Sequence, residues 1–472
     1  MADAVVVGSG PNGLAAAIVL ARAGVDVEVL EGAPTAGGGC RTEELTLPGY
    51  HHDVCSTVQA LAAISPFFDT VDLALHGVRL LVPDVAYAHP LDGGRAGAVV
   101  GSVATTAASL GADARAYGRL FSPLVGHAEV LYPEVLAPLG RTLPRHPLAM
   151  ARFGAVGLQP ISRLVRRFET PEARGLLAGV GAHAVRPLTA PFTSAFGLVL
   201  AVAAHTVGWP VVEGGSARLV EALTAELAAA GGTVTTGRWV TDLEELPRCD
   251  AIVLDTSPRT LASLARDRLS ARYLAALSRF PYGPGFCKVD WALSGAVPWA
   301  AEVCRRAGTV HVGGTFEEVA AAEADVAAGR HAERPFCIVV QPCVVDPSRA
   351  PAGGHTLWGY CHVPNGSTLD ATDAIESQIE RFAPGFRDLV LARATTTAAA
   401  SEVVNPNYVG GDVSGGPPTL RYLVSRPTMR WNPYRTPVKG LYLCSSYTPP
   451  GGGVHGMCGM AAARAALGDL DG

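Results

Sequence analysis

The chain has 472 residues, of which 49% are hydrophobic and 17% are charged. This length allows two domains with sizeable buried cores. The formal net charge of -5 at pH 7 gives no general attraction to nucleic acid. The ten cysteines lack the spacing of a metal cluster or a compact disulfide scaffold, so we predict reduced thiols and no metal site.

The start of the chain and its most apolar stretch both favour a cytoplasmic protein. A strand is predicted to begin at Ala4, which leaves no room for a signal peptide before it. The stretch 195–204 is followed by His205 and then Pro210, and it is too short to cross a bilayer. We expect it to form a buried element.

The first elements in chain order have the pattern of a dinucleotide site. The buried strand Ala4–Val7 leads into Gly8-Ser9-Gly10-Pro11-Asn12-Gly13, then a helix over 14–23 and a strand over 25–30. Gly8 permits the tight turn, Gly10 lets a pyrophosphate approach the backbone, and Gly13 lets helix and strand pack closely. Glu31 lies about twenty residues on, where a carboxylate accepts the ribose hydroxyls.

A second glycine-rich segment, Ala36-Gly37-Gly38-Gly39-Cys40-Arg41-Thr42, follows Glu31. It resembles the segment found after the second strand in the FAD-dependent amine oxidase and phytoene desaturase superfamily. Cys40 stands between the glycines and Arg41, so the spacing matches the family pattern loosely. The resemblance implies FAD in place of a nicotinamide nucleotide; an ordinary glycine-rich loop is the alternative.

Elements in the middle of the chain are predicted to belong to the same domain as the amino-terminal dinucleotide site. A helix follows Ser216, a strand begins near Thr233, and Asp250–Asp255 is a further buried strand. By the same resemblance, the backbone of Val240 contacts the adenine. The turn Asp255–Pro258, which contains Ser257, is implied to return near the cofactor.

The basic segment 141–168 lies in the first of two insertions. Six arginines occur in it without an acidic residue and are interleaved with large apolar side chains. This pattern is typical of a segment that lies on an anionic membrane or docks an acidic carrier protein. A solvated helix face is the alternative. The arginines are Arg141, Arg145, Arg152, Arg163, Arg166 and Arg167.

The carboxyl-terminal segment combines a strand over 440–444, two serines, a glycine-rich loop and a helix over 460–467. Gly451, Gly453 and Gly456 fit a second glycine triplet, but too few residues follow for another dinucleotide unit. The segment resembles the carboxyl-terminal motif of phytoene-desaturase-like proteins, including their pyridine nucleotide-disulfide oxidoreductase-like branch, where a helix start faces the flavin. Ser446 stands near the place where many relatives have an acid.

The resemblance implies an α/β fold with a doubly wound FAD-binding domain, as in glutathione reductase and the amine oxidases, and a discontinuous mixed α+β substrate domain. We place the FAD-binding domain at 1–71, 205–272 and 421–472, and the substrate domain at 72–204 and 273–420. The predicted cofactor-binding residues are Gly8, Gly10, Pro11, Asn12, Gly13, Glu31, Gly32, Gly38, Gly39, Cys40, Arg41, Thr42, Val240, Ser257, Ser446, Gly453, Val454 and His455.

Four residues are candidates for catalysis, each with a plainer alternative. His455 transfers a proton near the flavin or caps the helix that follows it. Lys288 lies in a strand-like segment, where related flavoproteins hold a lysine at flavin N5 through a water; pairing with a carboxylate is the alternative. Asp53 lines the ring or lies apart from it. Asp412 is a base or a turn residue.

The expected activity is dehydrogenation of an apolar polyene, isoprenoid or polyketide-like substrate, free or carrier-bound, by hydride transfer to flavin N5. The substrate class comes from the resemblance alone, and no residue spacing identifies it. The alternatives are a redox-neutral isomerase or saturase of such a chain, an amine oxidase, and a flavin-bound partner protein without turnover. No nucleic-acid partner is expected, and contact with a membrane surface would involve residues 141–168.

Overall fold

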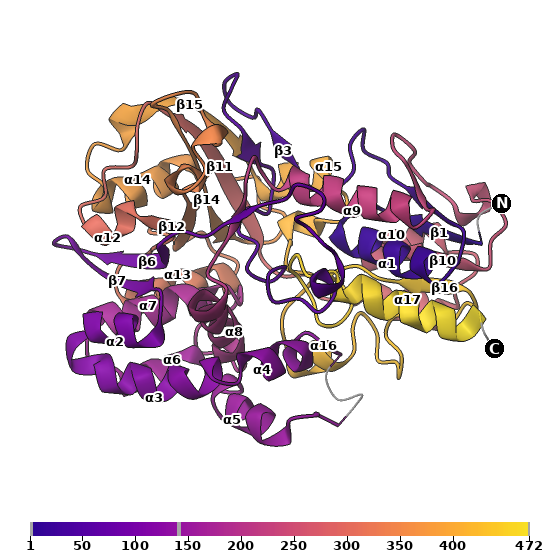
Figure 1. Ribbon diagram of the computed structural model, residues 1–472, viewed down its shortest axis with the longest axis horizontal. Helices are drawn as coiled ribbons and strands as arrows, with labels where there is room; N and C mark the ends of the chain where they lie inside the picture. Colours follow the sequence, from indigo (N-terminus) through magenta and orange to yellow (C-terminus); the bar gives the residue numbers. More distant parts are fainter. Residues whose placement is uncertain (1–2, 139–142, 471–472) are drawn as a thin grey trace.

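The computed structural model describes residues 3–138 and 143–470, which form a parallel sheet, a larger mixed sheet and a layer of helices (Figure 1). The parallel sheet has five strands in the order β16-β10-β1-β2-β9. All neighbouring strands in it run parallel. The strands are β1 (Ala4–Val7), β2 (Val27–Leu30), β9 (Thr233–Thr235), β10 (Ala251–Leu254) and β16 (Leu441–Leu443).

Helices cover both faces of the parallel sheet. Alternate side chains of its short apolar strands point to opposite faces, so each face needs a covering layer. Val6 belongs to the core that packs on one set of helices, and Val5 belongs to the core on the other face. The predicted doubly wound fold is therefore confirmed. One face carries α1 (Pro11–Arg22), α9 (Ala217–Ala229) and α17 (Met457–Leu470); the other carries α10 (Pro258–Leu264) and α11 (Ala271–Ser278).

The larger sheet has seven strands in the order β15-β11-β14-β13-β12-β6-β7. Neighbouring strands run antiparallel except for β6 and β12, which are parallel. The strands are β6 (Val85–Leu91), β7 (Arg95–Val100), β11 (Gly285–Leu293), β12 (Ala307–Val312), β13 (Cys337–Val340), β14 (His355–Val363) and β15 (Val390–Thr396). Helices α12 (Glu302–Arg305), α13 (Phe316–Ala327), α14 (Thr372–Phe382) and α15 (Ala398–Val404) belong to the same part of the chain.

A helical layer lies below the seven-stranded sheet in the view of Figure 1. The segment 195–204, predicted to be buried, falls within helix α8, against which α5, α6 and α7 pack. The helices are α2 (Val103–Ser109), α3 (Ala114–Val125), α4 (Ala128–Val135), α5 (Pro147–Gly157), α6 (Ile161–Leu164), α7 (Pro171–Ala182), α8 (Thr193–Thr206) and α16 (Leu420–Val424).

Two small ladders connect these layers, β3 (Thr42–Glu43) with β4 (His52–Asp53), and β5 (Leu80–Leu81) with β8 (Val211–Val212). Short 3-10 turns occur at Phe68–Thr70, Gly111–Asp113, Val165–Arg167, Leu243–Glu245, Pro342–Val344, Pro347–Arg349, Arg387–Leu389 and Val409–Gly411.

The two sheets draw on different parts of the chain. The parallel sheet takes its strands from 1–71, 205–272 and 421–472, and the seven-stranded sheet takes its strands from 72–204 and 273–420. The exact domain limits stay a prediction, because one hydrophobic core extends across both parts. Within the described residues, no helix is both long and apolar enough to cross a membrane.

Candidate active site

The loop between β1 and α1 forms one end of a cavity of about 690 Å³, within the usual size of a ligand pocket. Gly8, Gly10, Pro11 and Asn12 line it. Gly8 has φ of +100°, which a residue with a side chain rarely adopts. Gly13 does not line the cavity, and a Cβ atom there would lie 2.1 Å from the Gly8 carbonyl oxygen. This close contact fits its predicted packing role.

Glu31 faces the cavity at the end of β2. Its Oε2 accepts hydrogen bonds from the Ser9 backbone N–H at 2.9 Å and from the Ser9 hydroxyl at 2.6 Å. The Ala33 N–H donates to Oε1 at 2.8 Å. These donors hold the carboxylate in place beside the glycine loop, where it can accept hydroxyl groups of a ribose.

A tryptophan missed in the sequence analysis lies beside Glu31. A Cβ atom on Gly32 would come within 2.4 Å of the Trp239 ring, so the ring lies flat against this glycine. Trp239 is 60% exposed and lines the cavity together with Val240. Its position next to the predicted adenine contact at Val240 is the signal that could have identified it.

Asp255 is a second carboxylate at the glycine loop. Its Oδ2 accepts a hydrogen bond from the Gly13 N–H at 3.0 Å, at the start of α1. Burial raises the pKa of Asp255 to about 7, the Gly13 hydrogen bond opposes this, and the charge of Glu31 adds to it. Near neutral pH the side chain is therefore partly protonated.

The second glycine segment folds back over the first. Gly37 and Gly38 have φ of +123° and +56°, and a Cβ on Gly38 would lie 3.2 Å from the Gly10 Cα. Gly38, Gly39, Cys40 and Arg41 line the cavity. Thr42 does not; its hydroxyl donates to Asp53. Burial raises the pKa of the Cys40 thiol far above its usual range.

Polar atoms without partners mark the cavity as a site for a polar ligand. Asn12 Oδ1, Arg41 Nε and Thr256 Oγ1 are buried, and none has a hydrogen-bond partner within the described parts of the chain. Since buried polar groups are nearly always paired, a ligand that supplies the missing partners fits here. The three residues lie along the path from the glycine loop to the β10 turn, so the residues present fit an extended dinucleotide.

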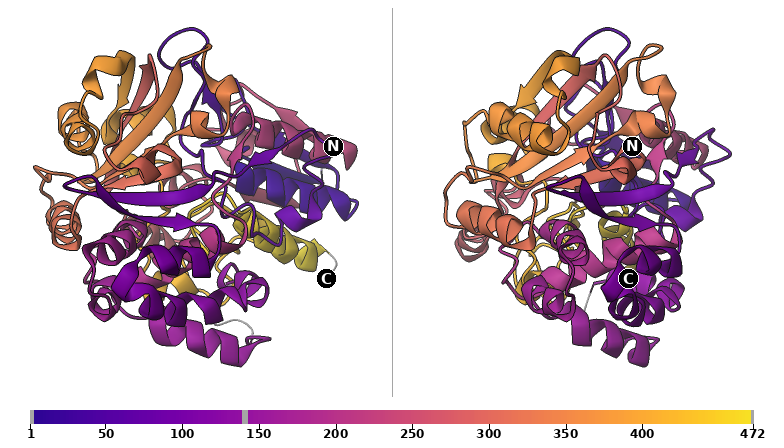
Figure 2. Two further views of the ribbon diagram at one scale, coloured as in Figure 1. Left: turned by 60° about the vertical axis from the view of Figure 1, so that its left-hand side comes forward. Right: turned by 90° about the vertical axis from the view of Figure 1, so that its left-hand side faces the viewer.

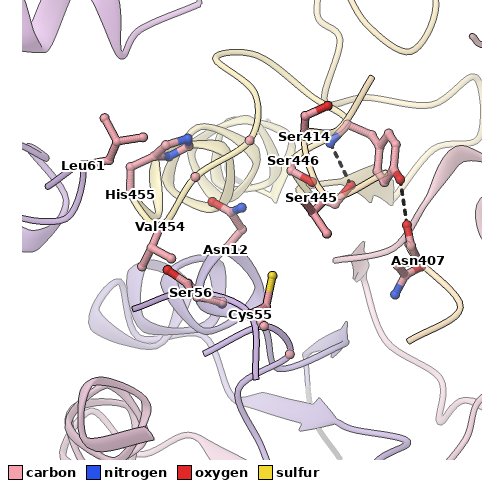
Figure 3. Close-up of a pocket in the computed structure, with 18 of the residues that line it drawn as sticks. Asn12, Cys55, Ser56, Leu61, Asn407, Ser414, Ser445, Ser446, Val454 and His455 are labelled. Atoms are coloured by element: carbon pink, nitrogen blue, oxygen red, sulfur yellow. Dashed lines mark hydrogen bonds between the residues drawn. The ribbon is translucent and has the colours of Figure 1, made fainter. Parts of the chain in front are cut away.

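The start of α17 closes the same end of the cavity, and Figure 3 shows His455, Val454 and Leu61 near Asn12. Both ring nitrogens of His455 are occupied: Nδ1 accepts from the Met457 N–H at 3.1 Å, and Nε2 donates to the Gly451 carbonyl at 3.0 Å. Burial lowers the pKa of His455 to about 4. The ring is a neutral cap of α17, which was the plainer of the two predicted roles.

The loop before α17 is tied to the β10 turn. The Ser445 hydroxyl donates to the Thr256 carbonyl at 2.6 Å. Ser446, Gly453 and Val454 line the cavity, as their predicted role in cofactor binding requires. Ser257 does not line it; its hydroxyl caps α10 by accepting from the Thr260 N–H. Thr256 takes the place expected for Ser257.

Lys288 lies on β11 and lines the cavity, with only 2% of its surface exposed. Its ammonium donates to Asp290 Oδ1 at 2.6 Å and lies 5.3 Å from the centre of the Trp358 ring. Burial raises the pKa of Asp290, whereas the Lys288 charge lowers it. The predicted alternative, pairing with a carboxylate, is present, and Lys288 also faces the cavity. Its role near flavin N5 stays a prediction.

Asp53 and Asp412 have structural partners. Asp53 does not line the cavity; it forms an ion pair with the buried Arg349 at 2.7 Å and accepts from the Ser216 N–H. Asp412 lines the cavity, but its carboxylate accepts from the N–H groups of Gly283 and Gly416 and from Ser414. Both carboxylates hold loops in place, because their acceptor positions are already used.

The other end of the cavity is an apolar chamber between the seven-stranded sheet and the helical layer. Strand residues Ile338, Val340, Trp358 and Tyr360 form one wall. Helices α4, α5 and α8 form the other. Residues on these helices that line the chamber are Val135, Met150, Phe153, Gly154, Gly157, Ala195, Phe196, Val199 and Leu200.

The chamber also contains His183. Its Nε2 lies 2.9 Å from Nε2 of His311, and burial lowers the pKa of His183 to about 3. Burial also lowers the pKa of His311, so both rings are neutral near pH 7. Among the described residues, no three side chains of His, Cys, Asp or Glu are grouped so as to hold a metal ion.

Comparison with known proteins agrees with this geometry. Residues 6–69 match the NAD(P)-binding Rossmann-like domain. The chain is 26% identical over 562 residues to pyridine nucleotide-disulfide oxidoreductase domain-containing protein 2 of Mus musculus, in a match that covers 99% of this chain and 94% of the mouse protein. A shorter match to a limonene dehydrogenase component of Castellaniella defragrans is 36% identical over 84 residues, 18% of this chain and 15% of that protein.

Solved amine oxidase structures share the fold. A putrescine oxidase bound to putrescine has a TM-score of 0.60 and 16% identity, covering 100% of this chain and 99% of its own. Cyclohexylamine oxidase from Brevibacterium oxydans has a TM-score of 0.60 and 15% identity, and both chains are covered completely. The family resemblance at the two ends of the sequence is thereby confirmed. Over nearly its whole length the chain is similar to the pyridine nucleotide-disulfide oxidoreductase domain-containing proteins, and it combines a Rossmann-like nucleotide-binding segment with the fold of the solved amine oxidases.

Proposed function

We propose that this protein is an FAD-dependent oxidoreductase that dehydrogenates an apolar substrate. The observation that carries the proposal is the continuity of the cavity, which runs from the glycine loop at Gly10 to the apolar chamber at Ile338 and Phe153. One end offers backbone N–H groups, carboxylates and unpaired polar atoms, and the other offers apolar walls. The first end suits a dinucleotide and the second suits an apolar molecule. Because the cavity is continuous, the two molecules could lie in contact with each other.

Each end has a defined task in this proposal. The loop at Gly8–Asn12 and the start of α1 bind the pyrophosphate, and Glu31 binds the ribose. FAD, when bound, accepts a hydride at N5. The start of α17 presents backbone N–H groups to the ring system, with His455 fixing their direction. Lys288 donates to Asp290 and places its ammonium group at the wall of the cavity.

The chamber favours an apolar substrate over an amine. The carboxylates that line the described cavity are Glu31, Asp255 and Asp412. The first two lie at the glycine loop, and the third already accepts from several donors. None is free in the chamber to pair with a substrate ammonium group. The partial similarity to a limonene dehydrogenase component supports an apolar terpene-like or polyene substrate.

Anaerobic reduction with a panel of substrates tests the proposal. We expect the purified protein to contain one FAD, and its absorbance to bleach with a terpene or polyene but not with putrescine or cyclohexylamine. Conversion of an apolar substrate without net bleaching would instead favour the redox-neutral isomerase or saturase. Bleaching by amines, or no conversion of any apolar substrate, would contradict the proposed dehydrogenation.

A pair of variants on α5 provides the matched control. Phe153→Asp places a carboxylate inside the chamber and should weaken binding of an apolar substrate by about tenfold or more. Ala151→Asp adds the same charge on the exposed face of the same helix and should leave binding unchanged. Equal effects of the two substitutions would show that the chamber is not the substrate site.

A further inference from the structure

Helix α5 has two different faces, and the difference follows from helical spacing. Met150, Phe153 and Gly157 recur every three or four residues and line the apolar chamber. Leu148 and Arg152 lie on the opposite face, where Leu148 is 81% exposed. The helix is therefore a wall of the chamber on its inner side and part of the protein surface on its outer side. Figures 1 and 2 show α5 at the outer edge of the helical layer.

Apolar residues are exposed at both ends of this helix. Leu143, before α5, is 92% exposed, and Leu158, after it, is 57% exposed. Leu158 also lines the cavity, so the cavity reaches the surface at the end of α5. Other exposed lining residues, Trp239 and Val404, lie toward the nucleotide end, where the ion pair of Glu402 with Arg259 ties α15 to α10. One opening of the cavity therefore lies next to α5, with Leu158 on its rim.

The segment that contains α5 carries positive charge that no ion pair among the described residues neutralises. Five arginines in the segment are exposed: Arg145, Arg152, Arg163, Arg166 and Arg167. In the described parts of the chain, none of their guanidinium groups forms an ion pair, whereas elsewhere Arg330 pairs with Asp325 and Arg435 with Asp469. The nearby Glu134 accepts a hydrogen bond from the backbone N–H of Arg145. Arg141 lies outside the described residues.

We propose that the outer face of α5 docks on an anionic lipid surface and places the opening of the chamber at the membrane. The exposed leucines would enter the boundary between headgroups and acyl chains, and the arginines would contact lipid phosphates. An apolar substrate could then pass from the membrane into the chamber without crossing water. The evidence for docking comes from the exposed residues of α5 alone. The transfer of substrate from the membrane rests in addition on the proposed function.

The exposed arginines and leucines together favour a lipid surface over a second copy of the chain or an acidic carrier protein. A second copy of the chain docked on this face would bring its own Arg145 and Arg152 opposite the same two arginines, and the like charges would repel. An acidic carrier protein satisfies the charge but gives no role to leucines at both ends of the helix. A lipid surface uses both features, because it offers phosphates and an apolar interior over the whole length of α5.

Co-sedimentation of the flavin-loaded protein with vesicles tests the docking. We expect binding to vesicles of phosphatidylcholine with phosphatidylglycerol, weakened by salt, and much weaker binding to phosphatidylcholine alone. Arg145→Gln with Arg152→Gln should reduce the affinity by about tenfold or more. Leu143→Ser with Leu148→Ser should also reduce it, and neither pair lines the chamber.

The matched control removes the same charge elsewhere. Arg266→Gln with Arg272→Gln changes two exposed arginines at α10–α11 and should leave vesicle binding unchanged. Flavin content and turnover of a detergent-solubilised substrate are measured on every variant, so failure of the proposed function is detected separately. Equal binding to both vesicle types, an equal loss in the control, or binding to acyl carrier protein but not to vesicles would overturn the proposal.

Discussion

Asp255 is an acidic residue at a place where a dinucleotide carries negative charge. Its carboxyl group caps the start of α1 through Gly13, and burial raises its pKa from 3.8 to about 7. A group whose pKa is raised on folding stabilises the folded state fully only below its unfolded pKa, and this contribution is lost as pH rises through the folded pKa. Asp255 therefore makes the protein less stable as pH rises from about 4 to about 7, and the cofactor site gains the negative charge of this carboxylate as pH passes about 7.

We expect Asp255→Asn to raise the free energy of unfolding at pH 8 by roughly 2 kcal/mol and to strengthen FAD binding there. The amide oxygen can still accept from Gly13, so the cap is kept. Thermal unfolding and FAD titration at pH 8 and pH 4 measure the effect, which should be small at the lower pH. An effect of the same size at both pH values would mean that the charge of Asp255 is not its cause.

Trp239 is a large exposed aromatic residue next to a binding site, which distinguishes it from an ordinary surface tryptophan. Its ring lies against Gly32, one residue after the carboxylate predicted to hold the ribose. We expect the adenine to stack on it, so Trp239→Ala should weaken FAD binding by about tenfold. Quenching of tryptophan fluorescence during FAD titration gives a second measurement, and Trp431→Ala, which changes an 86% exposed tryptophan elsewhere, is the control.

At the scale of elements, the site depends on how closely α1 approaches the loop before it. Gly13→Ala would place a Cβ atom about 2.1 Å from the Gly8 carbonyl, which is part of the rigid backbone. We expect loss of FAD retention, measured as flavin per protein after gel filtration, while far-ultraviolet circular dichroism stays close to wild type. Gly118→Ala, inside α3 with no neighbour within 4 Å, should retain FAD.

The glycine triplet at the carboxyl terminus has a different task. A Cβ on Gly456 would lie 2.4 Å from the Phe67 ring, and one on Gly453 would lie 2.4 Å from Leu61. These glycines let the loop before α17 pack against the segment that follows the second glycine cluster. The contact draws the two ends of the chain together, and it explains a triplet that is not a second nucleotide site.

At the scale of the whole molecule, the described residues contain one complete strand–loop–helix unit for a dinucleotide, at β1–α1. An enzyme that also held a nicotinamide in a domain of its own would need another such unit. We therefore expect neither NADH nor NADPH to bleach the oxidised flavin rapidly in anaerobic stopped-flow experiments. Fast bleaching that saturates with either nucleotide would show that a nicotinamide site exists.

The sequence by itself determined the nucleotide end of the protein. Gly8, Gly10 and Glu31 lie within one local strand–loop–helix–strand unit, where short-range spacing fixes both the turn and the carboxylate. The doubly wound fold was predicted from the resemblance carried by the motifs at both ends of the chain, and Lys288 was correctly placed on a strand. The glycine loop and its carboxylate are local, so a pattern of residue types was enough to find them.

Only the tertiary structure decided the roles of residues whose partners are distant in the chain. Asp53 pairs with Arg349, and Asp255 meets Gly13, across separations of hundreds of residues. The apolar chamber is likewise built from strands and helices of separate insertions, and no periodicity within one segment reveals a wall shared by several. Hydrogen bonds, ion pairs and cavities between remote segments depend on how the layers pack, and the packing is a property of the whole chain.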